Sequence, residues 1–335
     1  KLKNLVSQSK VLDFVCANSK VAVKIHFGEE DNTGYIRPEY AAVVCQELKS
    51  KKAIPFLSDS NTLYRGKRTN SGDHLKLAYE HGFLPDKAGA EVLIPDDTKK
   101  ENSLDFNLNA RFVKIAKISR IFDDAQALVG LAHFKGHIMT GFGGALKNIG
   151  MGCASRQGKL AQHGGMAPVV IKKKCTGCRA CENVCPVGAV TIFEKKSDID
   201  AVKCIGCASC IAACEFSAIE VNWEAGGDLI QEKMVEYAMA VLGKKKGRAV
   251  FFNFAIKITK ECDCLAKDDP RISPDIGIFV SSDPVAVDKA SFDSVVRTNG
   301  RDIFRDAHPK REGLKQLYYA QQLGLGSIEY DLIRI

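Results

Sequence analysis

Apolar runs of strand length alternate with amphipathic segments along the first 134 residues. An apolar run at 21–27 is followed by an amphipathic segment at 38–52 that starts on a proline, and then by a second apolar run at 53–59. Proline suits the first turn of a helix, so this order predicts strand, helix, strand. The rhythm continues with a predicted helix at 71–83 and predicted strands at 90–96, 111–119 and 127–134. Such alternation is typical of an open, largely parallel α/β sheet.

The same pattern resumes near the C-terminus after an interruption. The later segments are a predicted helix at 227–242, strands at 248–258 and 275–281, and helices at 284–297 and 313–323. Neither half offers a complete sheet by itself, so we expect the two halves to pack together as one domain. The predicted organisation is an α/β domain in two parts, residues 1–168 and 223–335, with an inserted α+β module at 169–222.

The interrupting segment is internally duplicated. "CTGCRACENVCP" begins at Cys175 and "CIGCASCIAACE" begins at Cys204, and one constant offset relates all four cysteines of the first run to those of the second. A short alternating run follows each copy, "GAVTI" in the first and "SAIEV" in the second, and each predicts a strand.

This cysteine spacing predicts two 4Fe-4S clusters. Three cysteines at C-x2-C-x2-C wrap one iron cubane, while the fourth reaches the other cluster. One predicted ligand set is Cys175, Cys178, Cys181 and Cys214, and the other is Cys204, Cys207, Cys210 and Cys185. A zinc ribbon would need cysteine pairs separated by longer linkers, which does not account for all eight. The segment resembles bacterial-type two-cluster ferredoxins.

Five cysteines lie outside this repeat. In "KECDCLA" an extended backbone would place the Cys262 and Cys264 thiols on one side, able to hold one metal ion, with Asp263 opposite. The alternative is that Cys262 and Cys264 are two buried thiols that bind no metal. Cys153, in a glycine-rich loop, is a candidate third thiolate or a structural residue. Cys16 and Cys45 have apolar neighbours and are predicted to lie in the core.

Polar side chains follow the predicted strands. Ligands of open α/β sheets bind beyond the carboxyl ends of the strands, so these residues are expected to converge. They are His26, Asp59, Asn61, His133, Lys135, His137, Cys262, Cys264 and Asp283. His133 and His137 are four residues apart, which would let both bind one metal ion if the segment were a helix. The preceding run predicts a strand instead, so the sequence does not decide whether they bind a metal together. The candidate third metal site comprises Cys262, Cys264, His133, His137 and Cys153.

Two loops carry groups suited to an anion. The glycine-rich segment 141–152 combines backbone amides with Lys147 at a helix start, and the loop 58–73 carries Arg65, Lys67 and Arg68. The alternative for the first segment is a tight turn without a ligand, and the alternative for the second is a solvated loop. The first segment matches neither the P-loop pattern nor a dinucleotide fingerprint.

Composition narrows the function classes. The formal net charge is +8, but Lys and Arg are spread along the chain, so a solvated basic surface is favoured and nucleic acid is an unlikely partner. No run approaches the roughly 18 apolar residues that a membrane span needs. Thirteen cysteines with C-x-x-C spacing in a chain of 335 residues indicate metal binding in a reducing cytoplasm, because disulfide frameworks belong to small secreted domains.

The whole chain resembles the iron-sulfur centre proteins of domain-of-unknown-function family 362. The resemblance lies in "VKIHFGEEDNTGYIRPEY", "LSDSNTLYRGKR", "HFKGHIMTGFGGALKNIGMGCASRQGK", "CDC" and "SSDPVAVD", in this order around the duplicated segment. This resemblance implies the α/β architecture with its inserted module and the presence of two 4Fe-4S clusters. The leading hypothesis is an anaerobic iron-sulfur oxidoreductase that relays single electrons between a redox partner protein or small-molecule substrate and a crevice site. The alternative is a non-enzymatic electron carrier or redox-sensing protein whose α/β body docks a partner.

Overall fold

A six-stranded sheet forms the centre of the larger part of the protein. The computed structural model describes residues 1–335 except 65, 97–98, 164–166 and 222–228. The strand order is β14-β13-β6-β1-β2-β3. The strands are β1 (Lys20–Ile25), β2 (Ile54–Ser58), β3 (Glu91–Val92), β6 (Ala127–His133), β13 (Ala249–Ala255) and β14 (Gly277–Ser281). All neighbours pair in parallel except β13 and β14, which are antiparallel. The predicted largely parallel sheet is confirmed.

The central strands are apolar because both faces of the sheet are covered. Every residue of β6 and β13 is buried, as in parallel sheets that carry helices on both sides. Successive residues of β1 belong to different cores: Val21 and Val23 pack in one apolar cluster and Ala22 in the other. This alternation follows from the two-residue repeat of a strand.

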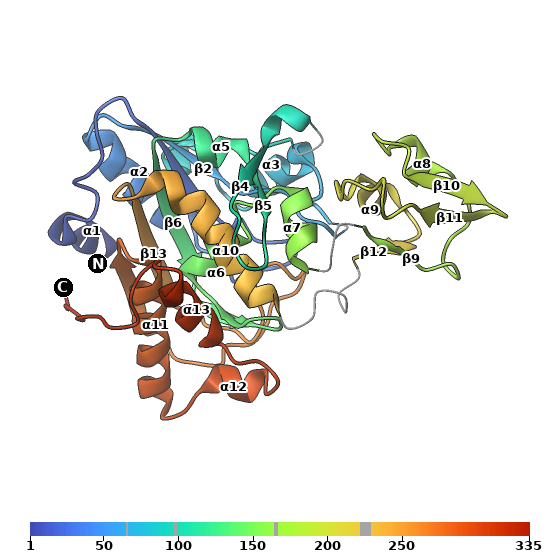
Figure 1. Ribbon diagram of the computed structural model, residues 1–335. Helices are drawn as coiled ribbons and strands as arrows, with labels where there is room; N and C mark the ends of the chain where they lie inside the picture. The colour runs from blue at the N-terminus through green and yellow to red at the C-terminus, as the bar shows by residue number, and fades with distance from the viewer. Residues whose placement is uncertain (65, 97–98, 164–166, 222–228) are drawn as a thin grey trace.

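Helices cover both faces (Figure 1). On one face the apolar cluster includes residues of α1 (Leu2–Ser9) and α2 (Pro38–Ser50). On the other it includes residues of α6 (Ala145–Gly150), α10 (Ile230–Leu242) and α11 (Pro284–Asn299). The molecule is therefore a three-layer α/β body.

Shorter elements complete this body. The helices are α3 (Ser71–Glu80), α4 (Pro85–Ala88), α5 (Arg120–Asp124), α7 (Arg156–His163), α12 (Ile303–Ala307) and α13 (Lys315–Gln322). Two antiparallel pairs are β4 (Ser103–Asn107) with β5 (Ile115–Ser119), and β7 (Lys135–His137) with β8 (Gly141–Gly143). Among the described helices, none combines the length and the apolar character required to cross a membrane.

The duplicated segment forms a separate small unit beside the body. Its elements are β9 (Val169–Val170), α8 (Ala180–Asn183), β10 (Val190–Phe193), β11 (Lys196–Ile199), α9 (Ser209–Ala213) and β12 (Ile219–Glu220). β10 pairs with β11 and β9 with β12, both antiparallel. Figure 1 shows the unit on the side opposite the two termini. Leu63 and Leu160 of the body belong to its apolar cluster, and Arg156 donates a 2.7 Å hydrogen bond to the Ala208 carbonyl.

The crossing of α6 and α10 requires a glycine at position 150. A Cβ atom there would lie 2.1 Å from the Met234 carbonyl oxygen, which is backbone and cannot rotate away. We expect Gly150→Ala to lower the free energy of unfolding by about 1–3 kcal/mol, because the overlap forces the helices apart. Denaturant unfolding measures this change. Gly243→Ala is the matched control, because its Cβ would meet Phe106 at an ordinary 3.7 Å. Equal losses in the two variants would contradict the packing argument.

Candidate functional site

Five parallel strands end at one edge of the sheet, and residues from distant parts of the chain come together there. His133 ends β6, Asp59 follows β2, and the loop after β13 returns Asp263 to the same edge. The expected convergence is wrong for Asp283. β14 is antiparallel to its neighbour, so its last residues lie at the opposite edge. Asp283 instead caps α11, accepting hydrogen bonds from the amides of Val285 and Ala286 at 2.8 and 2.9 Å.

A buried carboxylate organises the site. Asp263 is 1% exposed; the His133 Nδ1 donates to its Oδ1 at 2.9 Å, and the Lys135 ammonium donates to its Oδ2 at 2.9 Å. Burial alone would raise the pKa of Asp263, but these two partners more than offset it and hold the pKa well below its usual range. The His133 Nε2 lies 2.9 Å from the Ile256 carbonyl. Both ring nitrogens of His133 thus have oxygen atoms of the chain itself as partners.

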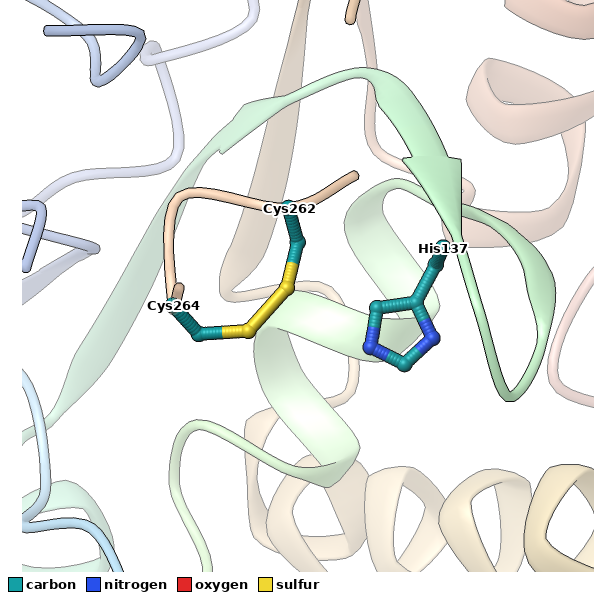
Figure 2. Close-up of side chains that lie close together, drawn as sticks. All are labelled: His137, Cys262 and Cys264. Carbon is teal, nitrogen blue, oxygen red and sulfur yellow. A yellow bond between two sulfur atoms is a disulfide. The ribbon is translucent and has the colours of Figure 1, made fainter. Parts of the chain in front are cut away.

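Cys262, Cys264 and His137 lie close to one another (Figure 2). The two cysteines form a disulfide, a pairing that the sequence does not predict, although their common side of the backbone agrees with the prediction. Within the described residues, this is the one group of three His, Cys, Asp or Glu side chains whose ligand atoms lie within 4.8 Å of one another. Of the predicted third-site residues, the structure therefore unites these three and leaves His133 and Cys153 outside.

The turn that follows His137 surrounds its Nδ1 atom with polar groups. This nitrogen lies 3.2 Å from the backbone nitrogens of both Met139 and Thr140, which can only donate. It also lies 3.0 Å from the Thr140 hydroxyl oxygen, which donates its own proton to the Phe142 carbonyl at 2.7 Å and can therefore accept another. Burial and the nearby Lys147 hold the pKa of His137 well below its usual value, so the ring is neutral. Nδ1 thus has two amide donors and one hydroxyl oxygen as partners, and Nε2 is the nitrogen that Figure 2 shows directed toward the sulfur atoms.

The edge of the sheet carries more cations than anions. Lys24 pairs with Asp59 at 3.0 Å, and Arg68 pairs with Glu29 at 3.0 Å. The cationic side chains are Lys24, Arg68, Lys135, Lys147 and Lys159, and the acidic ones are Glu29, Asp59 and Asp263. Burial, with Lys135 nearby, lowers the pKa of Lys147 to about 7. Sequence reasoning missed Lys24 and Glu29. Lys24 could have been found, because a lysine inside the otherwise apolar strand "VAVKIHF" indicates a buried charge.

The glycine-rich segment does not present its helix start to an external anion. The first amides of α6, those of Ala145 and Leu146, donate to the Asp288 carboxylate at 2.6 and 3.0 Å. The anion at this helix start is therefore the chain's own side chain, and burial raises the pKa of Asp288 to about 6. In the other loop, Arg68 is buried, Lys67 is partly exposed, and Arg65 lies outside the described residues.

The remaining single cysteines have structural positions. Cys153 and Cys45 are fully buried in the two apolar cores, and burial raises the pKa of each thiol to about 12. The predicted core position of Cys16 is wrong. This residue is exposed in the turn before β1, because its neighbour Val15 occupies the core-facing position.

The eight cysteines of the duplicated segment line two small cavities. One is lined by Cys175, Cys178, Cys181 and Cys214, and the other by Cys185, Cys204, Cys207 and Cys210. Each cavity thus takes three sulfurs from one loop and the fourth from the other. The amides of Ala189 and Ala218 donate to the sulfurs of Cys185 and Cys214, both at 3.2 Å. These bonds fix the positions of the two sulfurs that the cavities take from the other loop.

The fold and these sites define an α/β protein with a cysteine–histidine centre at the carboxyl edge of its sheet and a cysteine-rich unit beside it. The family model described as "Domain of unknown function (DUF362)" matches residues 21–293. The chain belongs to this family. No curated protein matches it.

Two solved structures show a low overall similarity to this chain. The lactate racemase apoprotein from Thermoanaerobacterium thermosaccharolyticum is 15% identical with a TM-score of 0.43, covering 76% of this chain and 49% of that one. A protein from Thermotoga maritima is 13% identical with a TM-score of 0.42, covering 90% of this chain and 59% of that one. The chain thus spans about half to three-fifths of the length of these two proteins.

The Asp263 contacts predict a pH dependence of stability. The folded-state pKa of Asp263 lies below its ordinary value of 3.8, so its contribution is present above that pH and is lost as the pH falls. We expect Asp263→Asn to lower the free energy of unfolding at pH 7 by about 3–5 kcal/mol, because Lys135 loses its buried partner. The loss relative to the parent protein should shrink below about pH 4, as followed by denaturant unfolding.

Asp13→Asn is the control for this variant. The Asp13 carboxylate is exposed and pairs with Lys51 at 2.9 Å on the surface. Such pairs contribute about 0–1 kcal/mol, so this variant should remain close to the parent protein at every pH. If Asp263→Asn behaves as this control does, the Asp263 carboxylate does not hold the site together.

Proposed function

We propose that this protein is an iron-sulfur electron-transfer protein, with two 4Fe-4S clusters that relay single electrons to the cysteine–histidine centre of the α/β body. The observation that carries the proposal is the cysteine lining of the two cavities. The loop spacing predicts three sulfurs from one loop and one from the other for each cluster, and each cavity has this set. A 4Fe-4S cluster supplies one-electron redox chemistry when bound.

The cysteine arrangement suits a cluster better than a single ion. Within the part of the chain that the structure describes, no three sulfurs of either cavity lie within 4.8 Å of one another. A single zinc ion needs four ligand atoms about one shared centre, whereas the four cysteines of a cubane each bind a different iron. The amide donors to Cys185 and Cys214 hold their sulfurs toward the cavities and stabilise negative charge on them.

The packing of the cysteine-rich unit supports a role for the body. Leu63 lies in the loop after β2 and packs in the apolar cluster of the unit. The same loop carries Asp59, and the Lys159 ammonium donates to the carbonyls of Ser60 and Asn61 at 2.9 and 2.6 Å. The unit is therefore anchored to a loop that also lines the polar edge of the sheet. This anchoring favours an oxidoreductase over a carrier whose body only docks a partner.

The charge at the sheet edge favours an anionic small-molecule substrate. Lys24, Arg68, Lys135 and Lys159, together with Lys147, whose pKa is lowered to about 7, face three acidic side chains, and this excess attracts negatively charged ligands. The redox partner protein that exchanges electrons with the clusters would contact the cysteine-rich unit.

Double substitutions test the cross-loop ligand sets. After anaerobic reconstitution we expect about eight irons per chain, and about four in Cys214→Ser. Adding Cys175→Ser to Cys214→Ser should cause no further loss, because both residues serve the same cluster. Adding Cys204→Ser should remove most of the remaining iron, because that residue serves the other. Iron analysis and electron paramagnetic resonance measure both outcomes.

The exposed Cys16 provides the matched control. Cys16→Ser removes a thiol far along the chain from the duplicated segment and should retain about eight irons. A folded parent protein that stays free of iron after reconstitution would refute the proposal. Iron loss that pairs Cys214 with Cys204 would refute the cross-loop sets and leave two separate four-cysteine loops.

A further inference from the structure

We infer that Cys262, Cys264 and His137 bind one thiophilic divalent metal ion, such as zinc, once the disulfide is reduced, and that the fourth position of this ion stays open to an external ligand. The three side chains come from two separate segments, the loop after β13 and the strand β7. The inference goes beyond the proposed function, because it concerns what this centre binds and not how electrons reach it.

The three ligand atoms are close enough for one ion. The two sulfurs and one imidazole nitrogen lie within 4.8 Å of one another. Zinc bonds of about 2.0–2.3 Å place the ligand atoms of one tetrahedral ion about 3.5–3.8 Å apart. Rotation of the two cysteine side chains gives this spacing after the S–S bond opens. Cys264 is partly exposed, which provides the entry path that an ion needs.

The surroundings of His137 fit a metal ligand. Its Nε2 is directed toward the sulfurs (Figure 2) and has no hydrogen-bond partner in the part of the chain that the structure describes. The closest partner of the other nitrogen, Nδ1, is the Thr140 hydroxyl oxygen at 3.0 Å, whereas the amides of Met139 and Thr140 lie at 3.2 Å. This hydroxyl gives its own proton to the Phe142 carbonyl and can therefore accept a hydrogen bond from Nδ1–H.

This hydroxyl oxygen has the role that an acceptor plays behind a metal-bound histidine. Such a histidine binds the ion through one nitrogen and donates the N–H of the other to an oxygen. Metal binding at Nε2 therefore selects the tautomer with the proton on Nδ1, which the Thr140 hydroxyl accommodates. His133 lacks this arrangement, because its two nitrogens have the Asp263 carboxylate and the Ile256 carbonyl as partners, and an ion at either one would break a bond.

The cysteine loop is held in place without its sulfurs. The Asp263 carbonyl accepts from the Glu29 amide at 3.0 Å, and its carboxylate accepts from the Lys135 ammonium at 2.9 Å. The Tyr64 hydroxyl donates to the Cys264 carbonyl at 2.8 Å. None of these bonds involves a sulfur atom. The backbone of the loop therefore stays in position when the S–S bond breaks, so the ligands are preorganised for the ion.

A dithiol reductant converts the sulfur pair into ligands. Two electrons and two protons pass from the reductant to the sulfurs, the S–S bond breaks, and the reductant itself becomes a disulfide. The ion then displaces both thiol protons to solvent and forms two metal–sulfur bonds. The two thiolates balance the charge of a divalent ion, and their softness favours zinc over magnesium or calcium. Three protein ligands leave one position open, as in catalytic zinc sites.

Zinc is the probe for this site. The intact protein, after anaerobic reconstitution of its iron, is reduced with dithiothreitol, freed of the reductant, incubated with zinc and desalted. We expect about one zinc per chain in addition to the iron, and X-ray absorption at the zinc edge should show two sulfurs at about 2.3 Å and two lighter donors at about 2.0–2.2 Å. Protein that has not been reduced should not retain this zinc.

Cysteine variants locate the bound zinc. Cys262→Ser/Cys264→Ser removes both sulfur ligands and should lose this zinc while it keeps the iron content of the parent protein. Cys16→Ser, which removes an exposed thiol, is the matched control and should retain the zinc. The same zinc content in the pair variant and in the parent protein would overturn the inference.

Thr140 is tested as a positioning residue. Thr140→Val keeps all three ligands and removes the oxygen acceptor, so we expect about 10–100-fold weaker zinc binding with the same two sulfurs at the zinc edge. His137→Leu, which removes a ligand, should bind zinc more weakly still. Competition with a chelator measures these affinities. Equal affinities in both variants and the parent protein would overturn the assignment of His137 as a ligand.

A second measurement on the parent protein does not depend on the folding of a variant. Trypsin releases residues 261–267, ECDCLAK, which contain both cysteines of the pair and no other. Bound zinc should slow alkylation of the reduced pair in the native protein at least several-fold, and a chelator should restore the rate. Equal rates with and without zinc would overturn the inference and leave the proposed function standing. Protection by zinc in a protein that binds no iron would refute the proposed function and leave the metal site standing.

Discussion

The contact of the Asp263 carboxylate with His133 and Lys135 is the interaction on which the site depends. Asp263 comes from the loop after β13, whereas its two partners come from β6 and β7, so the contact joins segments about 130 positions apart in the chain. A buried carboxylate is stable only with such partners, because desolvation otherwise favours its neutral form. The adjacent residues Cys262 and Cys264 are carried into place with it. The same β7–β8 hairpin that supplies Lys135 also supplies His137, so one carboxylate aligns the sulfur pair with the imidazole.

The surrounding charges extend this constraint. Lys24 and Arg68 are buried and each has an acidic partner, which holds the ends of β1 and β2 and the following loop in register. Burial and the nearby Lys147 and Lys135 lower the pKa of His137, and burial and Lys135 lower the pKa of Lys147. A site of this kind favours negative charge on whatever it holds, whether a thiolate of the chain or a bound anion. The cysteine-rich unit, anchored through Leu63 and Lys159 to the loop after β2, is placed beside this edge.

Much of the secondary structure was predictable because it follows from local patterns. The predicted helix at 38–52 and the predicted strands at 127–134 and 248–258 match α2, β6 and β13 within a few residues. The two strands were predictable because a strand that is covered on both faces is a continuous apolar run in the sequence. The direction of β14 was not predictable, because pairing is a tertiary property, and the misplaced Asp283 follows from it. Cys16 and Cys45 have similar neighbours in the sequence, yet only Cys45 lies in the core. A run of apolar residues does not say which of its members faces inward at a turn.

The sequence alone determined the alternation of strands and helices, the interruption of that pattern, and the two matching runs of four cysteines, because each depends on spacing within a short stretch. Only the tertiary structure decided which distant groups meet. It brought His137 to the Cys262–Cys264 pair, turned His133 toward Asp263, and occupied the start of α6 with Asp288. Spacing in a chain specifies local geometry, whereas long-range contacts are set by packing of the whole sheet.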